Sequence, residues 1–68
     1  MTQHEINLAE NHNRNRRYLR NLRNFVADSF RFARLDPEDQ TLILEQIQHM
    51  ADLDAVYEAR MRRLNLPI

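Results

Sequence analysis

Residues that could support nucleophilic catalysis are few in this 68-residue chain. Ser29 is the only serine, and His49 with Asp52 could complete a Ser–His–acid arrangement on paper. The chain has no glycine, so it can build neither a nucleophile elbow nor a glycine-rich phosphate loop. We interpret Ser29 as a small residue at a helix–helix contact, and we predict no catalytic residue and no enzyme activity.

The three histidines are the candidates for metal ligands. His4 and His12 lie eight residues apart, whereas His49 and Asp52 are spaced i, i+3, which places two ligands on one face of a helix. Neither pair has a third ligand that the sequence identifies, and the chain has no cysteine. The sequence therefore predicts no metal site and no cofactor.

Arginine supplies all ten basic residues of the chain, and five of them lie within residues 13–24, interleaved with Asn and Tyr. The planar guanidinium binds phosphate through two hydrogen bonds, while Asn and Tyr can meet base edges or stack on bases. This pattern indicates a possible nucleic-acid-binding helix. Its candidate residues are Arg16, Arg17, Arg20 and Arg23.

The charges of the chain are sorted into blocks. Residues 11–34 carry a net charge of +6, and residues 35–58 carry −7. In an antiparallel hairpin the arginines of the first block approach the late acids of the second, Asp52, Asp54 and Glu58. We favour this internal neutralisation over binding of the arginines to nucleic acid or to an acidic protein.

One clear break in the sequence separates the elements that would position these residues. Proline disfavours a helical conformation at the preceding residue, so a first helix should end by Arg34 or Leu35. Asp36 suits the N-cap of the next helix and Pro37 its first position. Because the connection is short, the flanking helices should be antiparallel neighbours.

Upstream of this break, apolar residues recur with helical spacing over residues 16–34. Residues 1–15 are rich in Asn and His, which are poor helix formers, so we expect a frayed or broken extension there. Thr2 with Glu5 forms a weak capping box, which would allow a helix to begin near residue 3.

Downstream of Pro37, an apolar stripe that includes Ile43, Ile47, Met50 and Met61 fits one unbroken helix over residues 37–64. Asp54 would lie at the centre of that stripe, and Val56 would point out of its back. A helix that ends near Ala51, followed by a new one, removes both conflicts. We therefore favour three helices over two, with bounds of about 16–34, 37–51 and 54–65.

The predicted fold is a single all-α domain over residues 1–68, an antiparallel helical hairpin. Three Phe, two Tyr and nine Leu are more apolar side chains than so small a unit can cover. We therefore predict a homodimer, with a different protein partner as the competing interpretation. The predicted interface residues are Tyr18, Leu22, Phe25, Val26, Phe32, Ile47, Met50, Tyr57 and Met61.

The arginine-rich stretch 13–24 resembles the short helices with which phage antiterminators bind RNA hairpins. In its size, its helical content and its arginine-rich segment, the chain also resembles the small early accessory proteins of temperate, lambdoid-type phages. That resemblance implies a regulator that binds a host or phage macromolecule in the bacterial cytoplasm.

We therefore predict a non-catalytic regulatory protein–protein interaction module, with a nucleic-acid-binding module as the alternative. No apolar run approaches the roughly 18 residues that a membrane span requires, so a membrane is not an expected partner.

Overall fold

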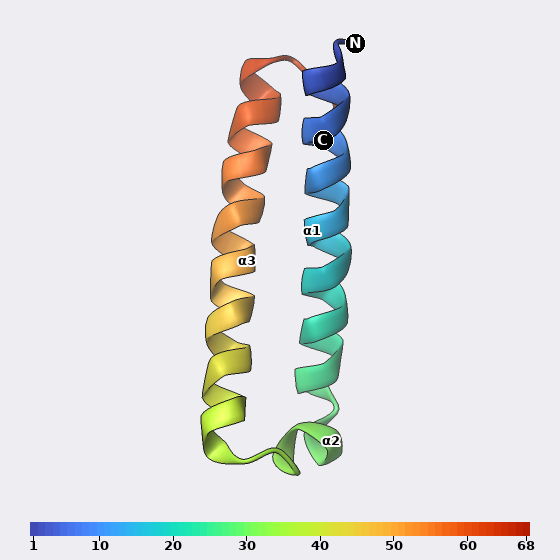
Figure 1. Cartoon of the computed structure of the whole chain (residues 1–68). Helices are drawn as coiled ribbons and strands as arrows, with labels where there is room; N and C mark the ends of the chain where they lie inside the picture. The colour runs from blue at the N-terminus through green and yellow to red at the C-terminus, as the bar shows by residue number, and fades with distance from the viewer.

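The computed structural model describes all 68 residues as a helical hairpin without strands. Helix α1 spans Gln3–Ala27, the short helix α2 spans Ser29–Ala33, and α3 spans Pro37–Arg63. The two long helices lie side by side and antiparallel, with α2 at the turn and both termini at the opposite end (Figure 1). The molecule is a rod with extents of 45 × 15 × 15 Å. The predicted all-α hairpin is confirmed, although the chain divides into three helices at other positions than expected.

Helix α1 begins at its first possible turn because Thr2 caps it. The Thr2 hydroxyl accepts from the Glu5 backbone N–H, and the Glu5 carboxylate accepts from the Thr2 backbone N–H, both at 3.2 Å. These two bonds form the capping box. The bond from the Thr2 backbone N–H is the largest cause of the lowered pKa of the Glu5 carboxyl, and a bond from the Thr2 hydroxyl to the same carboxylate is the next. The expected fraying of residues 1–15 is wrong, because polar residues of this segment pack against α3 and continue the helix.

The first long helix stops at Ala27, so the expected unbroken helix over residues 16–34 is also wrong. Asp28 leaves the helical conformation at φ −78° and ψ 82°. Its carboxylate accepts from the Arg31 backbone N–H at 3.2 Å, which makes it the N-cap of α2. An aspartate side chain that binds a nearby backbone N–H competes with helix continuation, and this competition explains the break.

The predicted boundary before α3 is confirmed. Asp36 is the N-cap of α3 and accepts from the Asp39 backbone N–H at 3.1 Å, and Pro37 occupies the first turn. The Gln40 amide reaches back across the turn and donates to the carbonyls of Phe32 at 3.0 Å and Leu35 at 3.1 Å. The Phe32 carbonyl also accepts from the Leu35 N–H, and the two bonds from Gln40 join the turn to the start of α3.

Helix α3 runs without a break from Pro37 to Arg63, so the expected division between residues 51 and 54 is wrong. Asp54 does lie in the stripe that faces α1, but there it meets His12 and Arg16 rather than apolar side chains. Val56 is 53% exposed on the outside of the helix. An acid that finds its partners on the other helix gives no reason for a break.

The far end of α3 closes through Asn65, which adopts a left-handed conformation at φ 56°. The Leu66 backbone N–H donates to the Met61 carbonyl at 2.9 Å, and the Asn65 N–H donates to the Arg62 carbonyl at 3.1 Å. This pair of bonds is a Schellman motif with asparagine in the place usually taken by glycine. It ends the helix and turns the last residues back toward α1 (Figure 1).

One seam between α1 and α3 forms the whole core. The side chains of both helices recur along it at alternating spacings of four and three, as in a coiled coil. From α1 the seam takes Leu8, His12, Asn15, Leu19, Leu22 and Val26, and from α3 it takes Ile43, Ile47, Met50, Asp54, Tyr57 and Met61. Only five residues of the chain are buried, and they are Leu8, His12, Asn15, Leu19 and Met61.

Candidate functional site

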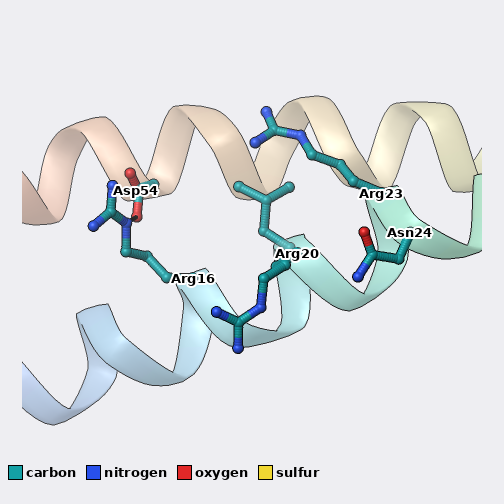
Figure 2. Close-up of a pocket in the computed structure, with 6 residues that line it drawn as sticks. Arg16, Arg20, Arg23, Asn24 and Asp54 are labelled. Atoms are coloured by element: carbon teal, nitrogen blue, oxygen red, sulfur yellow. Dashed lines mark ion pairs between the residues drawn. The ribbon is translucent and has the colours of Figure 1, made fainter. Parts of the chain in front are cut away.

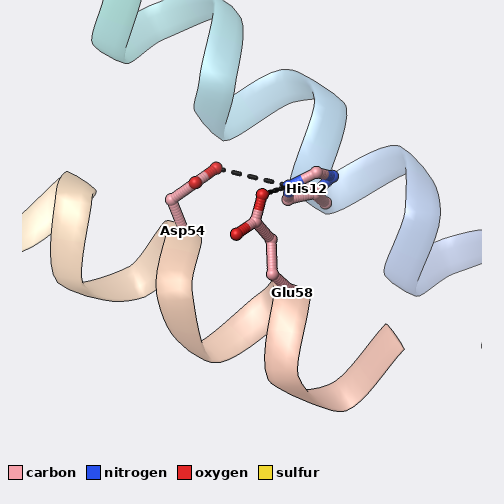
Figure 3. A group of neighbouring side chains, drawn as sticks. All are labelled: His12, Asp54 and Glu58. Atoms are coloured by element: carbon pink, nitrogen blue, oxygen red, sulfur yellow. Dashed lines mark ion pairs between the residues drawn. The ribbon is translucent and has the colours of Figure 1, made fainter. Parts of the chain in front are cut away.

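A polar cluster interrupts the apolar seam at the point where residue 12 of α1 faces residue 54 of α3. His12 is 2% exposed, and its Nε2 lies 3.4 Å from Asp54 Oδ1 and 3.7 Å from Glu58 Oε1. Asp54 and Glu58 are spaced i, i+4, so they share one face of α3 and flank the imidazole together (Figure 3). We call these three residues the His–acid cluster.

Arg16 borders the His–acid cluster one turn further along α1. Its Nε lies 3.5 Å from Asp54 Oδ1 (Figure 2), and its terminal nitrogen lies 3.5 Å from Glu58 Oε1. The Arg16 side chain is 56% exposed, whereas those of Asp54 and Glu58 are 16% and 19% exposed. The guanidinium therefore covers the cluster from the solvent side and can move away without disturbing the seam.

The His–acid cluster leaves hydrogen-bonding capacity unused. His12 Nε2 and Asp54 Oδ1 are both buried, and neither atom has a hydrogen-bond partner. An unpaired buried polar group costs about 1–3 kcal/mol of folding free energy. Asn15 in the same seam shows the ordinary arrangement, because its amide donates to the Met50 carbonyl at 2.9 Å. The cluster is thus a polar site that the fold maintains without satisfying it internally.

On one flank of the seam the hairpin carries an open apolar groove. Its lining residues are Tyr18, Asn21, Leu22, Phe25, Gln46 and Met50. Four large side chains continue this flank along α3 and are 40–54% exposed: Leu42, Leu53, Val56 and Leu64. They lie on one strip because they fall within about 80° of one another at 100° per residue. We call the groove and this strip the apolar face.

On the other flank of the seam lies a hollow bordered by arginines. It is lined by Arg16, Leu19, Arg20, Arg23, Asn24 and Asp54. The spacing i, i+4, i+7 places the three arginines in one row on α1, with Arg16 turned to Asp54 and Arg20 extending away from α3 (Figure 2). We call these three residues the arginine row. They face the side of the hairpin opposite Tyr18 and Phe25.

The predicted neutralisation of the arginines holds for only one of the four candidate residues. Arg16 pairs with Asp54 and Glu58 across the hairpin, as expected. Arg20 and Arg23 form no ion pair, and the guanidinium of Arg17 lies 5.9 Å from the centre of the Tyr18 ring. Most of the basic charge on α1 is therefore free to meet an anion.

The nine predicted interface residues lie in two kinds of place. Eight are at least half-buried by the chain itself, and they are Leu22, Phe25, Val26, Phe32, Ile47, Met50, Tyr57 and Met61. Tyr18 is 53% exposed. The seam within one hairpin thus takes up much of the surface that the sequence assigned to a partner, while the exposed leucines of α3 were not singled out.

The residues weighed for catalysis do not meet. Ser29 begins α2 at the turn, whereas His49 lies twelve residues into α3, about 18 Å along the helix. Asp52 accepts from the Gln48 amide at 2.9 Å and faces solvent. Of the histidines considered as ligands, His4 and His49 are exposed and His12 is buried.

The His–acid cluster was missed from sequence, although one signal pointed to it. Asp54 stood in an apolar stripe, and Glu58 follows it at i, i+4. A buried acid at a seam position requires a partner from the facing helix, and His12 occupies the α1 seam. The conflict was a sign of a polar contact between helices rather than of a helix end.

Comparison of the chain with protein-family models, with curated proteins and with solved structures finds no match. None of the three helices has the length and apolar character needed to cross a membrane.

Proposed function

We propose that the protein is a non-catalytic interaction module that acts as a homodimer, in which two hairpins pack through their apolar faces. The observation that carries this proposal is the strip on α3, where Leu42, Leu53, Val56 and Leu64 are each 40–54% exposed beside the apolar groove. Contiguous exposed apolar surface of this kind is typical of a protein–protein contact.

The spacing of the residues in the strip supports a helix as the element that packs against it. Residues 42, 46, 49, 53, 56 and 60 alternate at intervals of four and three, as in the seam, with Leu42, Leu53 and Val56 apolar and the other three positions polar. That repeat favours packing against another long helix over its length. The strip carries no carboxylate between Leu42 and Leu64, so two copies can approach without repulsion between acids.

The size of the face and the weakness of the core both favour a second copy of the chain. One side of the whole rod measures at most 45 × 15 Å, so a contact along its length approaches the roughly 800 Å² that each partner buries in a standard interface. Only three apolar residues are buried in the single hairpin, and chains of this length rarely stabilise one core alone. Pairing two hairpins forms a four-helix bundle with a second seam.

The test compares two leucines that are nearly equally exposed in the single hairpin. Leu42, at 54%, belongs to the apolar face, and Leu44, at 50%, lies about 200° further round the helix. Sedimentation equilibrium should show a dimer for the parent and for Leu44→Glu, and a shift toward monomer for Leu42→Glu and Leu53→Glu. A parent that stays monomeric at all concentrations contradicts the proposal, as does an equal effect of the changes at residues 42 and 44.

Nucleic-acid binding is the second candidate function, and the arginine row favours it. Arg20 and Arg23 have no acidic partner, and the row remains on the outside when the apolar faces pair. Contacts with phosphate release counterions, so binding should weaken steeply with salt. The regulatory role implied by the resemblance to phage accessory proteins stays a prediction under either function.

Fluorescence anisotropy with a labelled RNA hairpin and a DNA duplex tests this second candidate between 0.05 and 0.3 M salt, a range of about sixfold in ionic strength. Arg20→Ala/Arg23→Ala should weaken binding and flatten its salt dependence. The matched control is Arg34→Ala/Arg63→Ala, which removes the same charge outside the arginine row. Equal losses in both double variants would indicate attraction by net charge alone.

A further inference from the structure

We propose that His12, Asp54 and Glu58 form a binding site for a divalent transition metal of the zinc type, which joins α1 to α3. The three donor atoms all lie within 4.8 Å of one another. A tetrahedral zinc centre with ligands at about 2.0–2.2 Å places its donors about 3.3–3.6 Å apart. The distances of 3.4 Å and 3.7 Å from His12 Nε2 to the two carboxylates are already close to that separation.

The chemistry of the donor set selects the class of metal. Zinc and related transition ions accept an imidazole nitrogen together with carboxylate oxygens, whereas Mg²⁺ and Ca²⁺ prefer oxygen ligands alone. One histidine and two acids provide three protein ligands and leave a fourth position for water. The acids also balance the charge of the ion, because two carboxylates meet one divalent cation.

The unused bonding capacity of the cluster is the independent sign of a ligand. His12 is 2% exposed, and its Nε2 is aimed between Asp54 and Glu58 yet has no hydrogen-bond partner (Figure 3). Asp54 Oδ1 beside it also makes no hydrogen bond and has only ion-pair contacts, with His12 Nε2 and Arg16 Nε. Buried polar atoms in native proteins are nearly always paired, so two facing orphans require an explanation. A cation between them satisfies both atoms at once.

Arg16 acts in this site as a competitor for the metal. Its guanidinium lies 3.5 Å from each acid and supplies the positive charge that the ion would bring. Because the side chain is 56% exposed, it can swing into solvent when the cation enters. Removing Arg16 should therefore tighten metal binding, a result that a purely structural ion-pair cluster does not produce.

Calorimetric titration of the full chain with zinc chloride tests the site. We expect one ion per chain, with His12→Gln lowering the affinity by at least about 100-fold and Glu58→Gln by at least about 10-fold, because loss of a residue that only supports a ligand already costs about 10–100-fold. Arg16→Gln should raise the affinity several-fold, and magnesium chloride should not bind. His4→Gln and His49→Gln are the matched controls, because both replace exposed histidines.

Circular dichroism of every variant separates a lost ligand from a lost fold. Glu58→Gln keeps the proposal testable if His12→Gln unfolds, since Glu58 lies at the rim of the seam. The proposal is overturned if the folded parent shows no saturable zinc binding below about 100 μM, a free energy of roughly −5.5 kcal/mol. It is also overturned if His4→Gln or His49→Gln removes the binding, or if Arg16→Gln weakens it.

Discussion

The seam between α1 and α3 differs between the two halves of the hairpin, both in how polar its side chains are and in how deeply they are buried. Near the turn, the seam consists of apolar side chains such as Leu22, Ile43 and Ile47, yet all of them are only half-buried. Near the termini, the seam is more deeply buried, yet it contains His12 and Asn15 from α1 facing Asp54 from α3. The turn half therefore lacks apolar cover, whereas the terminal half places polar and charged side chains in the buried seam.

This difference shows that one repeat can serve two purposes. Both halves keep the alternating spacing of four and three, so the helices pack continuously from end to end. Apolar residues at these positions supply stability, while polar ones fix which residues face each other, because any slip of register leaves them unpaired. We interpret the polar seam positions of the terminal half as the part that sets the register, and the exposed strip of α3, which runs through both halves, as the part that associates.

The largest effect should follow from placing a charge in the turn half. Leu22→Asp introduces a carboxylate where a half-buried leucine meets both the seam and the groove, and it should cost about 3 kcal/mol or more. A core this small has little stability in reserve, so helicity and association should be lost together. Circular dichroism with sedimentation measures both. Asn13→Asp, on the exposed back of α1, is the control and should change neither.

Replacing the polar pair His12 and Asp54 by leucines, which resemble the apolar residues of the seam near the turn, sharpens the comparison. His12→Leu alone leaves Asp54 buried beside an apolar side chain and should destabilise the hairpin by about 1–3 kcal/mol. His12→Leu/Asp54→Leu should instead raise the free energy of unfolding by about 1–4 kcal/mol, because it removes both orphaned atoms. Urea denaturation measures the difference. A double variant no more stable than the single one would show that the polar pair contributes to folding.

A smaller effect is expected at the turn itself. Asp36→Ala removes the side chain that caps α3 and should lower the free energy of unfolding by about 1 kcal/mol. Asp36→Asn keeps an oxygen able to accept from the Asp39 N–H and should cost little. Thermal melts of the two variants decide this point, since equal midpoints would exclude capping as the role of Asp36.

The smallest effect concerns pH at the open end. The pKa of Glu5 is lowered by the backbone and side-chain hydrogen bonds from Thr2. A lowered pKa in the folded state means that the charged group adds stability above its ordinary range and loses it as the pH falls through the folded value. The midpoint of the parent should therefore fall slightly more than that of Glu5→Gln between neutral and acidic pH. Parallel curves would contradict the shift.

The sequence predicted the parts of the fold that local chemistry determines. Asp36 and Pro37 placed the start of α3, because capping and the fixed φ of proline act within a few residues. The break at Asp28 also has a local cause, an N-cap that the charge and apolar patterns do not reveal, whereas the unbroken course of α3 involves a distant contact. Asp54 stays helical only because His12 faces it, 42 positions earlier in the chain, and a periodicity confined to one helix cannot reveal that partner.

The candidate site was predictable to a similar extent. Arg16 was expected near Asp54 and Glu58 from the charge blocks, and it lies there. Arg20 and Arg23 lie in the same row nearer the turn, and neither forms an ion pair with an acid of α3. The exposure of the apolar strip on α3 could not be predicted, because the sequence does not show which apolar side of α3 packs against α1.

One measurement tests most directly whether the apolar face associates while the His–acid cluster binds metal. It is the two-dimensional NMR spectrum, followed during dilution and during addition of zinc. Dilution should move the methyl signals of Leu42 and Leu53, and zinc should move the imidazole signals of His12 while leaving those methyl signals in place. This assignment of roles is contradicted if dilution leaves Leu42 and Leu53 unchanged, or if zinc acts on His4 and His49 instead of His12.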